Sequence, residues 1–181
     1  MKRNLRIITI PNILSLFRLI LIPVYASMYL NAASDQEYLN AGIILSISCI
    51  TDMLDGWIAR RFNQISDIGK ILDPVADKLT QGVVLLCMAG KHPILWWVFG
   101  LLLIKELFQL IAGYLYLQKG NEVKGAVFSG KICTTVLFVS MILIMIFPSM
   151  PELYINCLAG GCIIFMLAAF GEYIHFYLGI R

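Results

Sequence analysis

Long apolar runs alternate with short polar segments along the whole chain. A transmembrane helix needs about 20 predominantly apolar residues. Six runs come close to that length: residues 13–30, 38–60, 69–90, 93–117, 126–147 and 153–178. The polar segments between them contain no soluble domain, no low-complexity tract and no repeat. The sequence therefore predicts an all-α integral membrane protein that forms a single domain over residues 1–181 and has six transmembrane helices.

The N-terminal segment, residues 1–11, has a different pattern. Lys2, Arg3 and Arg6 are interleaved with Leu5 and with isoleucines. A short basic amphipathic helix of this kind lies on the surface of an anionic leaflet. No clear small-residue cleavage site follows it, so we expect the first apolar run to be retained. The sequence thus predicts an interfacial helix before the first span.

The composition excludes several classes of protein. The chain has 181 residues, of which 60% are hydrophobic, and its mean hydropathy is +0.83. A soluble domain does not need so much apolar sequence. The five cysteines lie in apolar runs without a CxxC pair, so neither a zinc site nor a disulfide framework is indicated. We expect membrane lipids around the chain and no nucleic-acid partner.

The loop charges predict the orientation. In a six-span arrangement one side collects nine cations: Lys2, Arg3, Arg6, Arg60, Arg61, Lys70, Lys119, Lys124 and Arg181. The opposite side has the cation Lys91, together with the acids Asp35, Glu37 and Glu152. Lys and Arg mark the cytoplasmic side of a membrane protein. We therefore expect a multi-pass protein of the cytoplasmic membrane, with both termini and the turn between the second and third spans in the cytoplasm.

The second and third predicted spans carry four carboxylates, which apolar helices do not normally contain. Asp52 and Asp55 are spaced i, i+3, and Asp73 and Asp77 are spaced i, i+4, so each pair lies on one helix face. The polar segment 63–68 is a plausible turn between antiparallel helices, which would bring the two pairs to similar depths. Unpaired anions there would be very costly to desolvate. Hard divalent cations such as Mg²⁺, Mn²⁺ or Ca²⁺ are the simplest compensation.

The neighbouring residues suggest what such cations would bind. Gly56, Ala59 and Gly69 allow a ligand to approach the backbone closely. The guanidinium of Arg60 suits a phosphate, and Ser66 offers a hydroxyl. This set favours a pyrophosphate ligand clamped by metal ions.

Two other interpretations of the acids remain open. In the first, the acids form intramembrane salt bridges, Asp52 or Asp55 with Arg60, and Asp73 or Asp77 with Lys78. That arrangement would leave two acids uncompensated and the glycines unexplained. In the second, the acids form the permeation site of a divalent-cation transporter, which does not explain Arg60 or the small residues.

One family shares this arrangement. The run Asp52-x2-Asp55-Gly56-x2-Ala59-Arg60-x8-Gly69-x3-Asp73-x3-Asp77 resembles the signature of the CDP-alcohol phosphotransferases at every specified position. The resemblance implies an enzyme in which an alcohol attacks the β-phosphate of a CDP-linked lipid and CMP is released. It implies two divalent cations, Mg²⁺ or Mn²⁺, one held by Asp52, Asp55 and Asp73 and the other by Asp52, Asp73 and Asp77. Asp77 would also accept the proton of the attacking hydroxyl.

The resemblance further assigns residues to the CDP-lipid. These are the small and polar residues of the signature region and two residues of the first span: Gly56, Ala59, Arg60, Ser66, Gly69, Asn12 and Ser15. Relatives are homodimers, so we expect a homodimer. A catalytically silent relative that binds CDP-lipid without turnover is a further alternative.

The acceptor alcohol is a separate question. Residues 10–23, IPNILSLFRLILIP, and 72–79, LDPVADKL, look like segments of bacterial phosphatidylglycerolphosphate synthases, which use CDP-diacylglycerol and glycerol 3-phosphate. Those synthases often show GKxKT where this chain has Gly130, Lys131 and Thr134, but Cys133 replaces the second lysine. Lys105-Glu106 likewise stands where they commonly carry Arg-Glu. Phosphatidylglycerol, which gives cardiolipin, therefore remains open as the acceptor, as do serine, inositol and inositol phosphate.

A dianionic acceptor needs cations beyond Arg60. Arg18, Lys105 and Lys131 are the candidates. Each has another interpretation: Arg18 and Lys131 can extend to the interface, and Lys105 can pair with Glu106 or Glu172.

Overall fold

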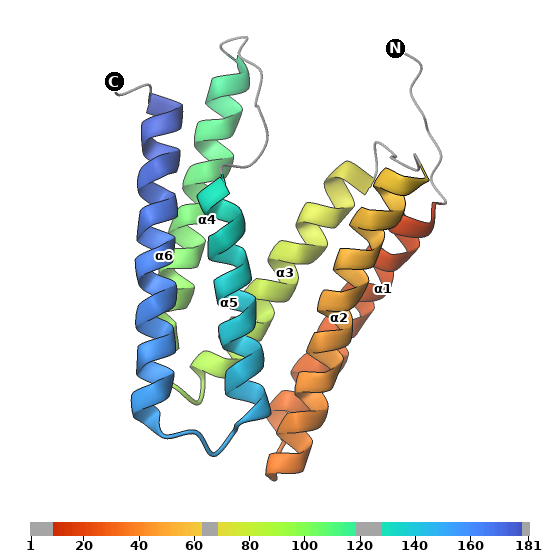
Figure 1. The fold of residues 1–181 in the computed structure, drawn as a ribbon, viewed down its shortest axis with the longest axis vertical. Coiled ribbons are helices and arrows are strands. Elements are labelled where there is room, and N and C mark those ends of the chain that lie inside the picture. Colours follow the sequence, from red (N-terminus) through yellow and green to blue (C-terminus); the bar gives the residue numbers. More distant parts are fainter. Residues whose placement is uncertain (1–8, 63–68, 119–127, 179–181) are drawn as a thin grey trace. The chain divides into compact units, whose positions relative to one another are not determined.

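The computed structural model describes residues 9–62, 69–118 and 128–178, and this part of the chain is entirely helical. Its helices are α1 (Ile10–Asn31), α2 (Asp35–Arg61), α3 (Gly69–Ala89), α4 (Leu95–Gln118), α5 (Phe128–Ile146) and α6 (Glu152–Leu178) (Figure 1). These are the six helices expected from the apolar runs. Four of them, α1, α4, α5 and α6, are long and apolar enough to cross a membrane, which makes the chain a multi-pass membrane protein. The helices α2 and α3, which carry the acids, fall below that limit, and their crossing of the membrane stays a prediction.

The start of the chain differs from the expectation of an interfacial segment over residues 1–11. Residues 1–8 lie outside the described part, and residues 10 and 11 already belong to the first turn of α1. Thr9 caps this helix, because its hydroxyl accepts a hydrogen bond from the Asn12 backbone N–H at 3.4 Å. Pro11 suits the first turn, where its missing N–H would have no partner in the helix. No separate amphipathic helix precedes α1 in the described residues.

The chain divides into two compact units. The first unit contains residues 1–87 and 145–149, and the second contains residues 88–144 and 150–181. The first therefore holds α1, α2 and nearly all of α3, and the second holds α4, α6 and nearly all of α5.

In the first unit, α1 and α2 form an antiparallel hairpin whose helices lie side by side (Figure 1). A short connection joins them, and the Tyr38 hydroxyl of α2 donates to the Ala32 carbonyl at 2.7 Å. The rings of Tyr29 and Tyr38 meet edge to face at a centroid distance of 5.3 Å. Glu37 accepts from the backbone N–H groups of Ala33 and Ser34 at 2.6 and 3.1 Å, which fixes the start of α2.

In the second unit, aromatic and polar contacts both join the helices. Phe108 of α4 packs edge to face on Phe170 of α6 at 5.1 Å. The Cys162 thiol of α6 donates to the Ser140 hydroxyl of α5 at 3.3 Å. Gly130 is buried against Tyr173 so closely that a Cβ at this position would lie 2.4 Å from the tyrosine oxygen.

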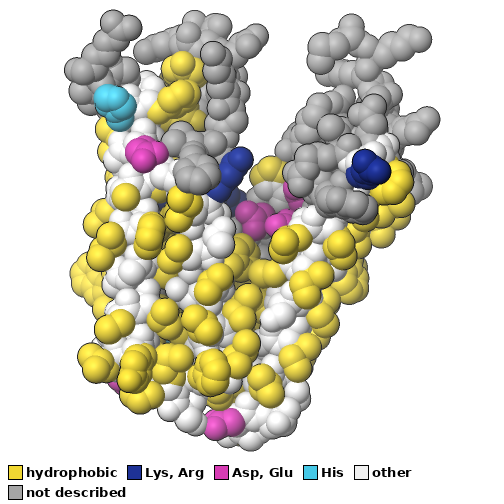
Figure 2. Space-filling view, in the orientation of Figure 1, with side chains coloured by type: hydrophobic (Ala, Val, Ile, Leu, Met, Phe, Trp, Pro, Cys, Tyr) yellow, Lys and Arg dark blue, Asp and Glu magenta, His cyan; other side chains and the backbone are white. Residues whose placement is uncertain are grey.

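The outer surface of the described helices is largely apolar. Large hydrophobic side chains are exposed on several helices, including Leu110 (69%), Leu153 (69%) and Trp97 (74%). Figure 2 shows hydrophobic side chains spread over the visible face, with few charged groups among them. Such a surface is stable in lipid but not in water.

Candidate functional site

The acids of α2 and α3 meet an arginine of α1. Arg18 forms an ion pair through Nη1 with Asp52 Oδ1 and through Nη2 with Asp73 Oδ1, the latter at 3.3 Å. Asp52 lies on α2 and Asp73 on α3. The structure thus brings one carboxylate from each acid-bearing helix to a single guanidinium.

Burial differs sharply between these partners. The Arg18 side chain is only 2% exposed, whereas Asp52 is 42% exposed and Asp73 is 44% exposed. The arginine therefore lies on the buried side of the carboxylates, and the acids are partly open elsewhere. A buried arginine that pairs with two acids compensates part of their charge without filling the open side.

Two more buried side chains contact the acids. The Ser15 hydroxyl of α1 is 3.1 Å from the Pro11 carbonyl and 3.4 Å from Asp73 Oδ1, and can donate to either oxygen. On α3, the Gln81 side-chain amide donates to Asp77 Oδ2 at 3.3 Å. Ser15 is 1% exposed and Gln81 is fully buried. Asp52, Asp73 and Asp77 therefore each have one carboxylate oxygen in contact with a buried polar side chain.

The remaining expected site residues divide into two groups. Asn12 is buried in the first turn of α1, and Gly69 is the first residue of α3. Four others lie on the C-terminal part of α2, but their side chains fall outside the described part: Asp55, Gly56, Ala59 and Arg60. Ser66 belongs to the segment 63–68, which falls outside it entirely.

The contact of Arg18 with the acids was not expected from the sequence. The alternative salt-bridge interpretation paired the acids with Arg60 and Lys78, which are neighbours along the chain. A usable signal was present, because an arginine within an apolar span needs an anionic partner at its own depth. Arg18 lies eight residues after the start of α1, and Asp52 lies nine residues before the end of α2.

The donor set suits hard divalent cations. Carboxylate oxygens are the ligands that Mg²⁺ and Mn²⁺ prefer, and the contacts of Asp52 and Asp73 with one guanidinium bring these two carboxylates together. Among the described residues no group of three metal-ligating side chains is close enough to hold an ion. The expected set includes Asp55, whose side chain lies outside the description.

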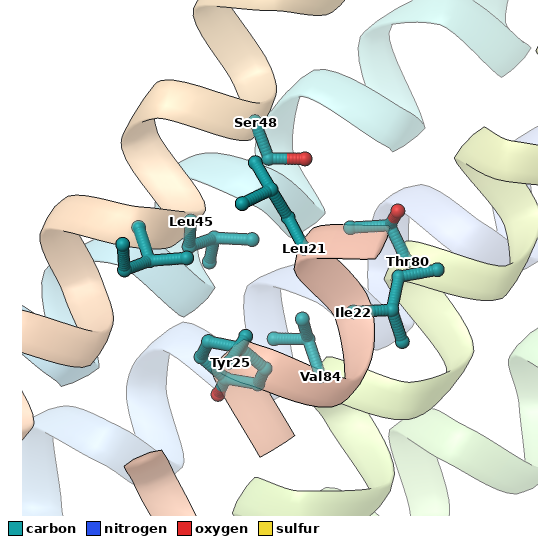
Figure 3. A pocket seen from close by; sticks show the side chains of 8 residues that line it. Leu21, Ile22, Tyr25, Leu45, Ser48, Thr80 and Val84 are labelled. Atoms are coloured by element: carbon teal, nitrogen blue, oxygen red, sulfur yellow. The ribbon is translucent and has the colours of Figure 1, made fainter. Parts of the chain in front are cut away.

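A small cavity lies between α1, α2 and α3, about one helical turn from the acids. Its volume is about 10 Å³, roughly the size of one water molecule. Its lining includes Tyr25, Ser48 and Thr80, but the Tyr25 hydroxyl points away from those of Ser48 and Thr80 (Figure 3). The cavity is therefore a gap in apolar packing and not a substrate pocket.

The candidate acceptor lysines belong to the second unit. Lys105 is 2% exposed and pairs with Glu106 at 2.8 Å, which agrees with the alternative interpretation of this lysine. Glu172, the other partner considered for Lys105, accepts a hydrogen bond from Ser129 at 2.6 Å. Lys131 is exposed near the start of α5. Cys133, which replaces a lysine of the resembled motif, is buried.

The acid-bearing region lies within a longer match to known proteins. Residues 8–172 match the family model described as CDP-alcohol phosphatidyltransferase. A probable phosphatidylglycerophosphate synthase of Mycobacterium tuberculosis is 33% identical over 133 residues, which cover 72% of this chain and 63% of that protein. A cardiolipin synthase (CMP-forming) of Streptomyces coelicolor is 34% identical over 131 residues, covering 71% of this chain and 61% of that protein.

A third relative matches over a shorter stretch. The CDP-diacylglycerol--glycerol-3-phosphate 3-phosphatidyltransferase of Escherichia coli is 37% identical over 89 residues, or 49% of this chain and 48% of that protein. The chain thus spans less than two thirds of the length of these relatives. The family model, however, covers most of the sequence, and the signature of acids lies within it. This chain belongs to the CDP-alcohol phosphatidyltransferase family.

Proposed function

We propose that this protein transfers the phosphatidyl group of CDP-diacylglycerol to glycerol 3-phosphate, giving phosphatidylglycerophosphate and CMP. The observation that carries the proposal is the meeting of Asp52 and Asp73 from two helices at one buried cation. Membership of the family supports the reaction type. Two relatives, the probable phosphatidylglycerophosphate synthase of Mycobacterium tuberculosis and the glycerol-3-phosphate 3-phosphatidyltransferase of Escherichia coli, support the acceptor.

The proposed cofactors are two divalent cations, Mg²⁺ or Mn²⁺. Asp52, Asp55 and Asp73 would hold one, and Asp52, Asp73 and Asp77 the other. When bound, these ions supply Lewis acidity and neutralise the charge of the diphosphate.

The residues around the acids would bind and orient the CDP-lipid. Gly56, Ala59 and Gly69 allow the diphosphate to approach the backbone, and Arg60 and Ser66 bind phosphate oxygens. Asn12 and Ser15, which the resemblance assigns to the nucleotide, are both buried in the first half of α1. Ser15 lies within hydrogen-bond distance of Asp73 and would act through that carboxylate.

The proposed chemical step is a single displacement. The acceptor hydroxyl forms a bond to the β-phosphorus of the CDP-lipid while the bond from that phosphorus to the bridging oxygen breaks. CMP leaves with that oxygen, and Asp77 accepts the proton of the attacking hydroxyl. Gln81 donates to one oxygen of Asp77 and thereby orients this carboxylate.

Arg18, Lys105 and Lys131 are the candidates for contact with the acceptor, each considered by itself. Lys131 is the strongest of the three, because it is exposed, whereas Arg18 and Lys105 have carboxylate partners. The cardiolipin synthase among the relatives favours a second acceptor, phosphatidylglycerol. Serine, inositol and inositol phosphate use the same chemistry.

The proposed setting is the cytoplasmic membrane. All six helices would cross it, with the acids facing the cytoplasm, as the loop charges predict. We also propose that the protein is a homodimer. On α6, a Cβ added at Gly160 or Gly161 would meet nothing within 4 Å, which leaves space beside the helix for a close neighbour.

A CMP-release assay tests the function and the acceptor together. Purified protein is incubated with CDP-diacylglycerol and Mg²⁺ or Mn²⁺, and glycerol 3-phosphate, phosphatidylglycerol, serine, inositol and inositol phosphate are offered separately. We expect CMP with glycerol 3-phosphate and none when the metal is chelated. CMP with another acceptor alone would correct the acceptor. No CMP with any acceptor, together with Mn²⁺ flux in proteoliposomes, would favour a cation transporter.

A further inference from the structure

Three buried polar side chains lie against the half-exposed acids of the first unit: Ser15, Arg18 and Gln81. We propose that these three form a supporting layer, a set of positioning residues that fixes the carboxylates of Asp52, Asp73 and Asp77 so that their remaining oxygens can bind divalent cations. The inference deepens the proposed function and rests on it.

The contacts of the layer are distributed over all three acids. Arg18 binds Oδ1 of Asp52 and, at 3.3 Å, Oδ1 of Asp73. Gln81 binds Oδ2 of Asp77, also at 3.3 Å. In each acid the contact involves one oxygen, so the second oxygen of the carboxylate stays available to another ligand.

Burial separates the layer from the acids it holds. Ser15, Arg18 and Gln81 are between 0% and 2% exposed, whereas Asp52 and Asp73 are 42% and 44% exposed. The supporting groups therefore lie on the protein side, and a ligand reaches the acids from the open side. Arg18 does not occupy the place of a bound cation, because its guanidinium is enclosed by the helices.

Gln81 shows most clearly that the layer serves the acids. It is fully buried on α3, and its carbonyl oxygen has no hydrogen-bond partner in the part of the chain that the structure describes. Its amide end, in contrast, contacts Asp77. Leucine has a similar volume and would avoid burying that oxygen. The arrangement is explained if the amide is needed to orient the carboxylate.

Metal binding without substrate tests this layer directly. We expect Arg18→Lys, which keeps the charge but loses the two-pronged geometry, and Gln81→Leu each to weaken Mn²⁺ binding about 10–100-fold, the range for partners that orient metal ligands. Ser15→Ala should have a smaller effect. The dissociation constant is measured by electron paramagnetic resonance of free Mn²⁺ with purified protein in detergent.

Thr80→Val is the matched control. Thr80 is buried next to Gln81, but its hydroxyl donates to the Ala76 carbonyl at 2.8 Å and not to an acid. We expect its Mn²⁺ affinity to equal that of the unmodified protein. Helicity by circular dichroism and gel filtration establish that each variant folds. If Arg18→Lys does not fold, Gln81→Leu decides the result.

The outcomes separate the two proposals. If the unmodified protein binds Mn²⁺ and releases CMP, but Gln81→Leu binds Mn²⁺ with unchanged affinity, the supporting layer is wrong and the function stands. If the variants lose affinity but no acceptor yields CMP, the layer stands and the transferase is wrong. A protein that binds no Mn²⁺ overturns both.

Discussion

Nine polar or charged side chains are buried in the part of the chain that the structure describes, and seven of them belong to the first unit. The second unit buries two, Lys105 and Ser140. Lys105 pairs with the next residue of its own helix, whereas Arg18 of the first unit pairs with acids from two other helices. Burying polar groups in a membrane protein is costly unless they are satisfied.

The difference indicates what each unit does. In the first unit, several buried polar side chains contact the acids that we propose to be the metal ligands. In the second unit, aliphatic and small side chains fill most of the interior, and among the described residues the buried Lys105 and Ser140 contact Glu106 and Cys162 but no group of acids. We therefore expect substitutions of polar residues to affect catalysis in the first unit, and packing changes to affect stability in the second.

The largest effect is expected from the acids themselves. Asp73→Asn should lower CMP release by more than about 100-fold, because the loss of a metal ligand exceeds the loss of an orienting partner. The protein should still fold in detergent, which gel filtration and circular dichroism establish. Glu172→Gln in the second unit, which changes a carboxylate bonded to Ser129, should retain most of the activity. An equal loss of CMP release in both variants would contradict the conclusion that catalysis depends on the polar residues of the first unit.

The next effect concerns the free energy of unfolding. Breaking a buried ion pair costs about 3–5 kcal/mol, but Asp52 is 42% exposed, so solvent weakens the pair. A double-mutant cycle with Arg18→Gln and Asp52→Asn should give a coupling of about 1–3 kcal/mol without metal.

The ion pair between Lys105 and Glu106 in the second unit serves as the control for this prediction. Mn²⁺ should reduce the coupling between Arg18 and Asp52, because the metal shares the carboxylate. It should leave unchanged the coupling between Lys105 and Glu106, measured with Lys105→Met and Glu106→Gln. A coupling near zero for Arg18 and Asp52 would contradict the ion pair.

A smaller effect is expected from packing in the second unit. Gly130→Ala would place a Cβ 2.4 Å from the Tyr173 oxygen and within 3.3 Å of its ring, so we expect a loss of about 1–3 kcal/mol of stability. Thermal unfolding in detergent measures it. Gly171→Ala on α6 is the control, since its Cβ would meet nothing within 4 Å. The loss from Gly130→Ala should shrink in a Tyr173→Phe background, and an equal loss there would mean that the hydroxyl is not the obstacle.

The smallest effect is at the start of α2. Backbone hydrogen bonds from Ala33 and Ser34 lower the pKa of the Glu37 carboxyl. The folded pKa is then below the unfolded value of about 4.3, so the charged form stabilises the protein above that pH. This contribution is lost as the pH falls through the folded pKa. Glu37→Gln should lower the melting temperature slightly at neutral pH, and the difference should vanish in acid. A difference that stays constant with pH would contradict this.

Much of the architecture was predictable from local sequence. The apolar runs predict all six helices to within a few residues, because helix length and apolar content are properties of one segment. The polar segment 63–68 and the spacing of the acids predict that two helices bring carboxylates together. The start of α1 differs from the prediction, because residues 10 and 11 were assigned to the interfacial segment and belong to the first turn of α1.

The support of the acids was not predictable in the same way. Arg18 and Asp73 are 55 residues apart in the sequence, and a buried arginine has several possible anionic partners until its helix is placed. The same holds for Gln81, whose contact with Asp77 follows from helix spacing but whose complete burial depends on the helices around it.

The sequence alone thus determined the helices, the acids and their spacing, and the family signature, because each is written in one contiguous stretch. The tertiary structure alone decided that α1 supplies the cation for acids on α2 and α3, and that the supporting side chains are buried while the acids are half exposed. Charge pairing and burial depend on which helices pack together, and no local pattern specifies that packing.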